Sequence, residues 1–502
     1  MKDKKQNKIP LFINLFLSTL LISSCSLFEE NLADRVVPDL IDLNNNEGDG
    51  YKKESAKSYT IKDVYDTNNM KIMPSIGKSS LLVVPVSTLD GPKWDILMLD
   101  NLQKAFFGDS DVTGWESVSS FYKKSSYGKL DIVGQVCEPF NLNYTTSDLA
   151  NSAKNGEEKE PYVTVVDEFE KSDLYNLYRK DFDKDNDGYI DAVAFIYSNE
   201  IDSKNGYWAV TSWNDSKRNI DNPNVNVFMW ASYNFVYGNQ MHDNIYSYSA
   251  YDNKVDAHTL IHETGHLLGL DDYYCYDNSY DPSGTIEMQS NNIGDHSIFS
   301  KFALGWIDPY VVSTNSKTTL TLRTSSKYPD AILINDSWNK STLDEYLIIE
   351  YYSPDVLNNK DAVSSYKGNG FRMYTSSGFR IYHVDARIVE VSVRGLMKNY
   401  ANKIEDGKYY FVGASNTPSL SYLNSNKNDF KLLHLLEAGG KNTFKNGKSA
   451  TNETLFKKGD VFEPSKEFFY NNDSFNSGER INYKFFINDS SKYQGTITIE
   501  RY

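Results

Sequence analysis

Residues 261–274 read IHETGHLLGLDDYY, and this stretch decides the fold and the chemistry that we expect of the chain. On a helix, His262 and His266 lie four residues apart, so their rings project from one face and can share a single cation. Glu263 lies at the edge of that face, where its carboxylate can reach a water molecule held by the cation without binding the cation itself. The pattern therefore predicts a metal site on a helix.

The residues after His266 are expected to deliver a third ligand. Gly269 can take a positive φ at the helix end and turn the chain back, which brings Asp272 toward the two rings. Two imidazoles and one carboxylate leave the fourth position of a zinc ion open for water, as in catalytic sites. Glu263 can accept the proton of that water and later pass it to a leaving amine. These spacings predict a zinc-dependent peptidase.

The alternative is a chance placement of two histidines and an acid on one helix. The chain has only seven histidines, and five residues match the extended spacing, so chance is a poor explanation.

The sequence around the motif predicts a mixed α/β region. Apolar runs rich in β-branched residues indicate strands at 79–87, 130–136, 192–197 and 225–237. We expect the last of these at a sheet edge or lining a cleft. Helical spacing predicts helices over 115–127 and 254–268.

The pattern H-E-x-x-H-x-x-G-x-x-D resembles metzincin-type zinc peptidases with aspartate as third ligand, specifically the immune inhibitor A family. Met288, in IEMQS at 286–290, resembles the Met-turn of these enzymes. Other stretches resemble further parts of the family: FYKKSSYGKL at 121–130, GDH at 294–296, SKFALGW at 300–306, YHVD at 382–385 and LLEAGG at 435–440. One position departs from the pattern, because Ser290 stands where several metzincins place a tyrosine. Tyr273, Tyr274 or His296 are the alternatives for a second group that stabilises the oxyanion.

The resemblance implies an α+β fold with a zincin- or metzincin-like catalytic domain, a twisted mixed sheet with an active-site helix, at 78–309. After Pro309, short strands separated by polar turns predict a β-sandwich-like domain at 310–502. These strands are expected at 318–322, 346–351, 379–383 and 496–499.

Residues 183–191 read DKDNDGYID and predict a calcium loop. Carboxylates at alternate positions precede a glycine that permits a tight bend, as oxygen ligation of Ca²⁺ requires. The predicted site residues are Asp183, Asp185, Asp187, Tyr189 and Asp191. The loop is not an EF-hand, because its twelfth position is Ala194 and a strand follows. The resembling family also carries a calcium loop here, and its expected role is structural; the alternative is a solvated acidic turn.

The N-terminus predicts export and lipid attachment. Four lysines precede an apolar run at 9–22, which is too short to span a bilayer but suits a signal peptide. The ISSC at 22–25 resembles a bacterial lipobox, so we expect cleavage after residue 24 and lipidation of Cys25. Residues 25–77 are polar, and we interpret them as a tether or a pro-like segment. Cys137 and Cys275 could pair or stay apart.

Charge limits the partners. The chain has 68 Asp and Glu against 52 Lys and Arg, so we expect no nucleic-acid partner. The expected partners are protein or peptide substrates and, through Cys25, a membrane, which places the chain at the cell membrane or surface, outside the cytoplasm. The rival hypothesis is a surface-anchored binding lipoprotein with a weak or idle zinc site. Retention of Glu263 argues against it.

Overall fold

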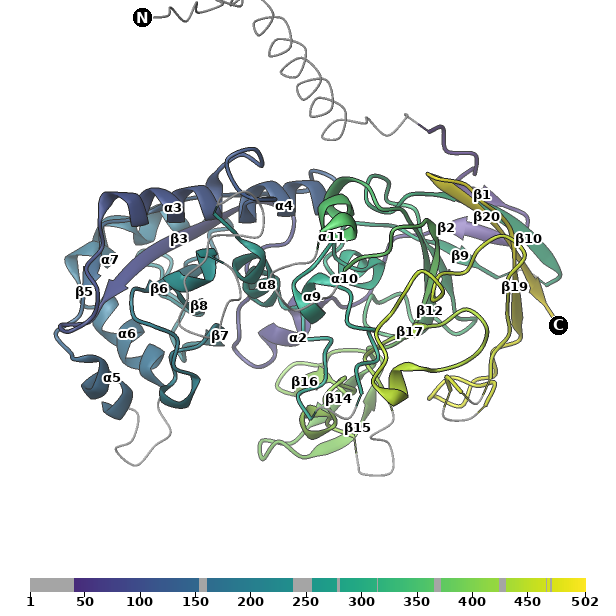
Figure 1. Ribbon diagram of the computed structural model, residues 1–502. Coiled ribbons are helices and arrows are strands. Elements are labelled where there is room, and N and C mark those ends of the chain that lie inside the picture. Colours follow the sequence, from purple (N-terminus) through teal and green to yellow (C-terminus); the bar gives the residue numbers. More distant parts are fainter. Residues whose placement is uncertain are drawn as a thin grey trace, which may run out of the picture. The chain divides into compact units, whose positions relative to one another are not determined.

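The computed structural model (Figure 1) describes residues 40–152, 160–237, 255–277, 280–313, 315–364, 372–423, 430–465, 467–469 and 472–502. Its contacts divide the chain into Met1–Ile41 and Asp42–Tyr502, and every element below belongs to the second unit. The predicted signal peptide and Cys25 lie outside the described residues. In the described part, no helix combines the length and the apolar character that crossing a membrane requires.

A mixed sheet of parallel strands with one antiparallel edge holds the N-terminal half together. Its strand order is β4-β3-β6-β8-β7. The first four strands are parallel, whereas β7 runs antiparallel to β8. The bounds are Gly77–Ser87 (β3), Leu130–Val136 (β4), Val193–Tyr197 (β6), Val210–Trp213 (β7) and Val227–Ser232 (β8), and the short β5 (Phe140–Asn141) also pairs with β3.

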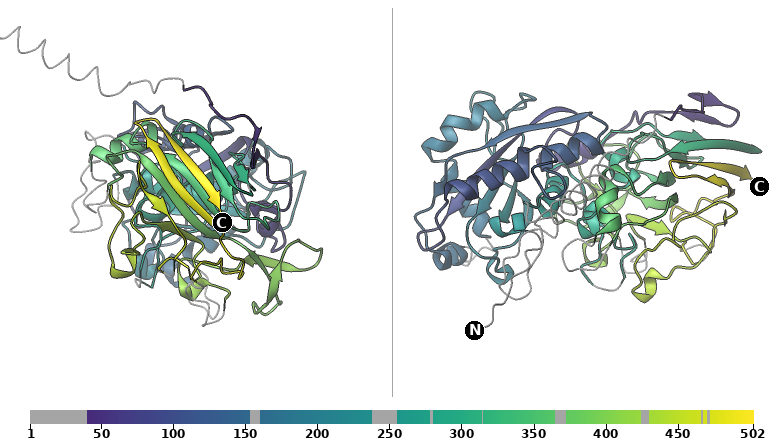
Figure 2. Two further views of the ribbon diagram at one scale, coloured as in Figure 1. Left: turned by 90° about the vertical axis from the view of Figure 1, so that its right-hand side faces the viewer. Right: turned by 45° about the horizontal axis from the view of Figure 1, so that its top comes forward.

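Both faces of this sheet are covered by helices, which explains the continuous apolar run in β3. Leu81 and Val83 belong to a core that includes side chains of α3, α4 and α8. Leu82 and Val84 belong to a separate core with side chains of α5, α6 and α7. Figure 2 shows α3 lying along the sheet. The helices are Ile96–Phe107 (α3), Val118–Ser125 (α4), Thr146–Ser152 (α5), Pro161–Phe169 (α6), Asp173–Tyr178 (α7) and His258–Leu267 (α8).

The strand predicted over 225–237 lies in a different place from the one expected. Only Val227–Ser232 forms the strand β8, and it lies inside the sheet, between β6 and β7. The following residues form a 3₁₀ helix, Tyr233–Tyr237. The edge strand is β7, which has the sequence VTSW and is only half-buried, so the sequence carries no strong apolar signal there.

Two further sheets make up most of the C-terminal half. One has the order β1-β2-β9-β11-β12-β13-β17, in which β1 is Glu47–Gly48 and β2 is Tyr51–Lys53, and the other has the order β10-β20-β19-β18. Ile349 and Ile381 of the first share a core with Leu320 and Ile497 of the second. The strands are Tyr310–Val312 (β9), Lys317–Arg323 (β10), Ile332–Ile334 (β11), Glu345–Tyr352 (β12), Gly378–Asp385 (β13), Leu433–Leu436 (β17), Val461–Phe462 (β18), Tyr483–Ser490 (β19) and Gln494–Arg501 (β20). All four strands predicted here are present.

A small sheet and several short helices complete the unit. The sheet has the order β15-β14-β16. The bounds are Ile388–Val391 (β14), Met397–Ala401 (β15), Tyr409–Val412 (β16), Ile61–Asp66 (α2), Met288–Asn291 (α9), Ile298–Ala303 (α10) and Asn359–Val363 (α11). The fold is therefore mixed α+β with several mixed sheets, as predicted at that level.

Residues 42–77 belong to the folded unit, which the tether interpretation did not anticipate. Strand β1 (Glu47–Gly48) pairs with β2 (Tyr51–Lys53), and β2 pairs with β9. The next residues form α2, whose first turn is closed by a capping box between Thr60 and Asp63. The pairing of β2 with β9 is made with residues far along the chain, so the local composition of the segment did not reveal it.

The predicted boundary at 309 does not separate two cores. One hydrophobic cluster contains Leu260 of α8 together with Tyr346 of β12 and Val384 of β13. The regions 78–309 and 310–502 therefore share buried side chains.

Candidate metal centre

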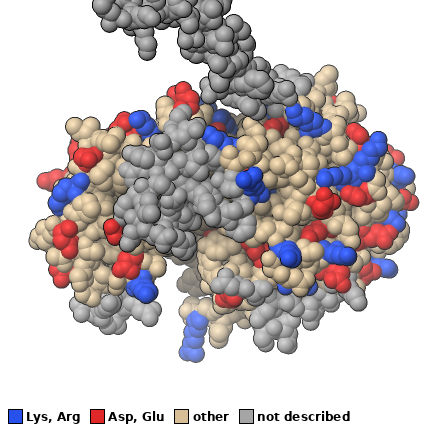
Figure 3. All heavy atoms as spheres, viewed as in Figure 1, with Lys and Arg blue, Asp and Glu red and all other residues tan. Residues whose placement is uncertain are grey.

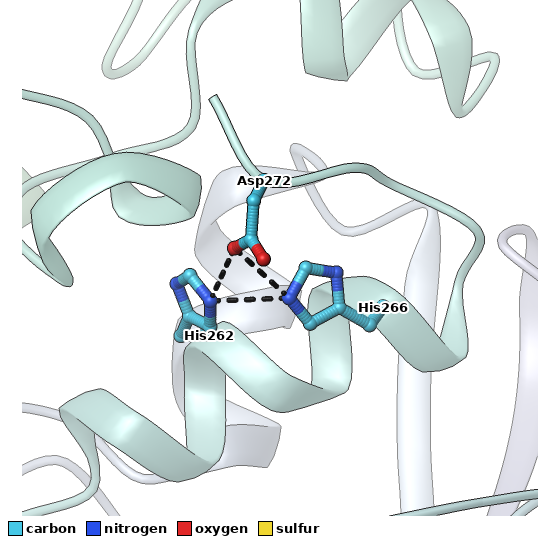
Figure 4. Close-up of side chains that lie close together, drawn as sticks. All are labelled: His262, His266 and Asp272. Carbon is cyan, nitrogen blue, oxygen red and sulfur yellow. Dashed lines mark hydrogen bonds and ion pairs between the residues drawn. The ribbon is translucent and has the colours of Figure 1, made fainter. Parts of the chain in front are cut away.

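Helix α8 carries two of the three predicted ligands. Leu260, Ile261 and Leu267 are buried in the main core. His262 and His266 both line a cavity, and their Nε2 atoms are 3.1 Å apart (Figure 4). The four-residue spacing therefore brings the two rings together as the sequence predicted.

The end of α8 turns the chain back toward these rings. Gly269 has φ +92°, a conformation that L side chains rarely adopt. Its N–H donates to the carbonyl of His266 (2.9 Å), and the N–H of Leu270 donates to the carbonyl of Gly265 (3.0 Å). This pair of bonds is a Schellman motif. It returns the chain so that Oδ1 of Asp272 lies 2.9 Å from Nε2 of His262 and 3.2 Å from Nε2 of His266.

The hydrogen bond at the second nitrogen of each ring, Nδ1, determines whether Nε2 can accept at the site. Nδ1 of His262 lies 2.8 Å from the carbonyl oxygen of Met288, and Nδ1 of His266 lies 2.7 Å from that of Leu270. A carbonyl oxygen only accepts, so each Nδ1 donates a hydrogen, and a ring that is neutral, as cation binding requires, presents a bare Nε2 to the site. With Asp272, three acceptor atoms then meet at one point.

These three residues fit a divalent cation. Zinc holds nitrogen and oxygen ligands at about 2.1 Å, which separates tetrahedral ligands by about 3.4 Å. The three separations here are 2.9, 3.1 and 3.2 Å, close to that value. Two imidazoles and a carboxylate also match the ligand types of catalytic zinc.

The electrostatics of the triad favour positive charge between its members. Burial raises the pKa of Asp272, but the charge of His266 and hydrogen bonds from both imidazoles outweigh it and hold the pKa well below the usual range. Burial lowers the pKa of His266, and Asp272 outweighs that effect and raises the pKa to about 10. A cation at this position is therefore stabilised by its surroundings.

Glu263 lies beside the triad with an available oxygen. The residue is buried, at 6% exposure, and within the described residues its Oε2 has no hydrogen-bond partner. Burial raises the pKa of this carboxylate, against the opposing effect of both imidazoles. Its backbone carbonyl accepts a hydrogen bond from Oγ1 of Thr211 on β7, at 3.1 Å. The arrangement suits a proton acceptor that faces the site.

Met288 and Gln289, at the start of the short helix α9, contact α8 and hold it in place. The Met288 side chain is fully buried, and its carbonyl holds the His262 ring. Nε2 of Gln289 donates to the His262 carbonyl at 3.2 Å. A Cβ at Gly265 would overlap the Gln289 amide, so the glycine between the two histidines is needed for this close approach.

Of the three residues considered for a second electrophile, two are engaged elsewhere. The Tyr273 hydroxyl lies 3.0 Å from Oγ of Ser300, and the His296 ring lies 3.3 Å from the Tyr122 hydroxyl. Ser290, which replaces the expected tyrosine, donates to Asp281. Tyr274 lines the cavity, and its ring centroid lies 6.4 Å from that of His262.

The sequence did not point to Tyr276. Its hydroxyl donates to Oδ2 of Asp272, the oxygen that does not face the imidazoles. Tyr276 lies in an irregular loop, where no periodic spacing relates it to Asp272, so only the folded loop reveals the contact.

The site opens into a cavity of about 600 Å³. Edge strand β7, helix α2 and the region of β16 contribute its walls, together with the end of α8. Residues from these walls include Ile61, Val64, Tyr65, Val210, Thr211, Trp213, Phe411, Val412 and Tyr422. The segment that we interpreted as a tether or pro-like segment therefore forms one wall of the cavity.

The structure brings together part of the predicted calcium site. One carboxylate oxygen from each of Asp183, Asp185 and Asp187 lies within 4.8 Å of the others. Asp191 is not in this group, because its Oδ1 accepts from the N–H of Lys184 and its Oδ2 accepts from Ser80 of β3. Asp191 thus ties the loop to the sheet. The N–H of Tyr189 donates to Asp187 (2.9 Å).

The two remaining cysteines are buried thiols that do not form a disulfide. Burial raises the pKa of Cys137 to about 12, which makes its thiolate scarce at neutral pH.

No protein-family model matches the chain, and no curated protein matches it at a significant level.

Proposed function

We propose that this chain is a zinc-dependent endopeptidase that hydrolyses peptide bonds of proteins outside the cytoplasm. One observation carries the proposal: three acceptor atoms, from His262, His266 and Asp272, converge beside the buried carboxylate of Glu263. This set offers three ligands and one base, which is what metal-assisted peptide hydrolysis requires.

A zinc ion held by the triad supplies a Lewis acid that polarises the scissile carbonyl and acidifies a water molecule. Glu263 accepts the proton of the attacking water at Oε2 and then donates it to the leaving amine. Met288 and Leu270 keep the imidazoles oriented, and Tyr276 restrains Asp272.

In this proposal, an extended peptide substrate pairs with strand β7. It is the edge strand of its sheet, so one row of its backbone N–H and C=O groups is not used by β8. Val210 and Thr211 of this strand line the same cavity as Glu263. An extended peptide that adds to this edge passes the triad, and main-chain pairing of this kind accepts many sequences.

We also propose a finer architecture for the chain and its location in the cell. A zincin- or metzincin-like catalytic part is supported by the mixed sheet and by α8, and a sandwich-like C-terminal part by the two sheets that share a core. Asp183, Asp185 and Asp187 provide a structural Ca²⁺ site. The lipobox-like sequence before Cys25 supports a lipid anchor at the membrane.

The test replaces the base and keeps the ligands. Glu263→Ala is expected to retain one zinc ion per chain and to lower cleavage of casein or of a peptide library by about a hundredfold or more. Glu453→Ala, which removes an exposed glutamate, is the control and should keep full cleavage. Unchanged cleavage by Glu263→Ala would contradict the proposed mechanism.

A further inference from the structure

The cavity contains an acidic side chain that the proposed mechanism does not use. Asp271 precedes the ligand Asp272, and both line the cavity. Asp271 is exposed to the cavity space. Within the described part of the chain, no hydrogen bond or ion pair engages its carboxylate.

Two aromatic pairs line the same cavity as this carboxylate. The Tyr65 ring packs on Trp213, with centroids 5.5 Å apart, and Tyr422 stacks on Phe411, with centroids 4.8 Å apart. All four rings line the cavity. Burial raises the pKa of Tyr65 and of Tyr422, and the charge of Asp271 adds to both shifts, which places that charge near both side chains.

Apart from the two imidazoles, the described residues that line the cavity include no cationic side chain. None of them is a lysine or an arginine, whereas Asp271, Asp272 and Glu263 all contribute carboxylates. On the face drawn in Figure 3, by contrast, basic and acidic side chains are interspersed. The imidazoles lie 2.9 and 3.2 Å from Asp272, so a ligand with its own positive charge supplies a partner for Asp271.

The side chains of arginine and lysine match these walls. Their aliphatic stems pack on apolar and aromatic surface, and their cationic ends interact with ring faces and carboxylates. An uncharged side chain in the same place leaves the carboxylate without a partner as water is displaced, and an acidic one is repelled.

We propose that Asp271 makes the cavity a subsite for an arginine or lysine side chain of the substrate, next to the cleaved bond. The inference rests on the proposed peptidase function and adds a preference in substrate sequence. Asp271 contributes binding of the substrate side chain and takes no part in the proton transfers of Glu263.

The activity test uses the full-length chain and glycine-rich peptides that differ in one central residue, arginine or norleucine. We expect kcat/KM to be about tenfold or more higher for the arginine peptide, as a charge-assisted contact provides. Asp271→Asn should bring the ratio of the two values close to one, and Asp271→Lys should favour a glutamate peptide. Asp221→Asn, at an exposed position, is the matched control and should keep the wild-type ratio.

A binding test separates this inference from the peptidase proposal. In the Glu263→Ala background the same two peptides, labelled with a fluorophore, are titrated against protein of measured zinc content. The arginine peptide should bind about tenfold more tightly, and Asp271→Asn should abolish the difference. Equal binding of both peptides, or a preference that survives Asp271→Asn, overturns the inference. A chain that cleaves nothing but shows this charge preference would overturn only the peptidase proposal.

Discussion

At the level of single residues, each candidate ligand is also held by a second contact, at an atom of its side chain that does not face the other two ligands. The carbonyls of Met288 and Leu270 hold the imidazoles, and the Tyr276 hydroxyl holds the far oxygen of Asp272. Such contacts fix the orientation of a ligand and so lower the cost of ordering it when a metal binds.

Tyr276→Phe removes only the hydroxyl that contacts Asp272. We expect the affinity for zinc to fall by about ten- to a hundredfold, because the carboxylate loses its restraint. Competition with a chromogenic chelator measures this. Tyr422→Phe removes a hydroxyl from the same cavity without touching a ligand, so it should leave zinc affinity unchanged; an equal loss in both variants would contradict the role of Tyr276.

At the level of elements, the bend after α8 decides whether Asp272 reaches the histidines. Gly269 holds a positive φ there, and a Cβ would also lie 3.3 Å from the methyl groups of Ile61 and Ile72. The turn is thus constrained by its own backbone and by its neighbours.

Gly269→Ala is expected to lower the free energy of unfolding by about 1–2 kcal/mol, the cost of a side chain at positive φ. It should also weaken zinc binding, since the bend carries Asp272. Gly459 has a similar φ of +95° with open space around it, so Gly459→Ala should lose comparable stability and keep zinc affinity. Denaturant unfolding and zinc titration of both variants make the comparison.

The loop at 183–191 is a second element, and we propose that a bound Ca²⁺ orders it. Removing Ca²⁺ with a selective chelator, with zinc kept in excess, should lower the melting temperature by a few degrees, since a bound ion stabilises the folded state by mass action. Asp185→Asn should melt at the lower temperature and ignore the chelator, because it removes one exposed ligand. Asp221→Asn is the control. A melting temperature insensitive to the chelator in the wild type would contradict the calcium site.

At the level of the whole molecule, the regions on either side of residue 309 are joined by buried contacts near helix α8. His258, at the start of α8, lies between Asp256 and Asp361 of α11, with its Nδ1 3.0 Å from one carboxylate and its Nε2 3.5 Å from the other. Its ring stacks on Trp115, with centroids 4.2 Å apart. This buried cluster links the motif helix to the C-terminal region.

The cluster predicts how stability depends on pH. Burial lowers the pKa of His258, but the two aspartates outweigh it and raise the pKa to about 9. An unfolded histidine titrates near pH 6.5, so the charged ring adds stability below that pH and loses it as the pH rises through about 9.

His258→Gln should therefore lower the free energy of unfolding at pH 6 by about 3 kcal/mol and flatten its decline between pH 6.5 and 9. Burial, with nearby positive charges, lowers the pKa of His434 to about 3, so His434→Gln should leave the slope in that window unchanged. Urea unfolding across the pH range measures both. An unchanged slope in His258→Gln would contradict the link.

The local sequence determined most of the elements near α8 and the convergence of the three candidate metal ligands. Helical spacing places His262 and His266 on one face, and a glycine at positive φ turns the chain, so these relations extend over only eleven residues, 262–272. The strands at 79–87, 130–136 and 192–197 were predictable for the same reason. Burial of one or both faces of a strand requires apolar residues at the buried positions, and this pattern lies within each strand's own sequence.

Tertiary structure decided what surrounds that triad. The cavity is lined by Tyr276, Asp271, edge strand β7 and helix α2. These parts are brought together by contacts between segments that are far apart in the chain or that lie in irregular loops. The sequence left residues 25–77 as a tether or a pro-like segment, because the short contacts that residues 42–77 make with β9 and β16 leave no periodic pattern of their own. Periodicity records which side of an element is buried, but not which distant element buries it, and that choice is made only when the whole core packs.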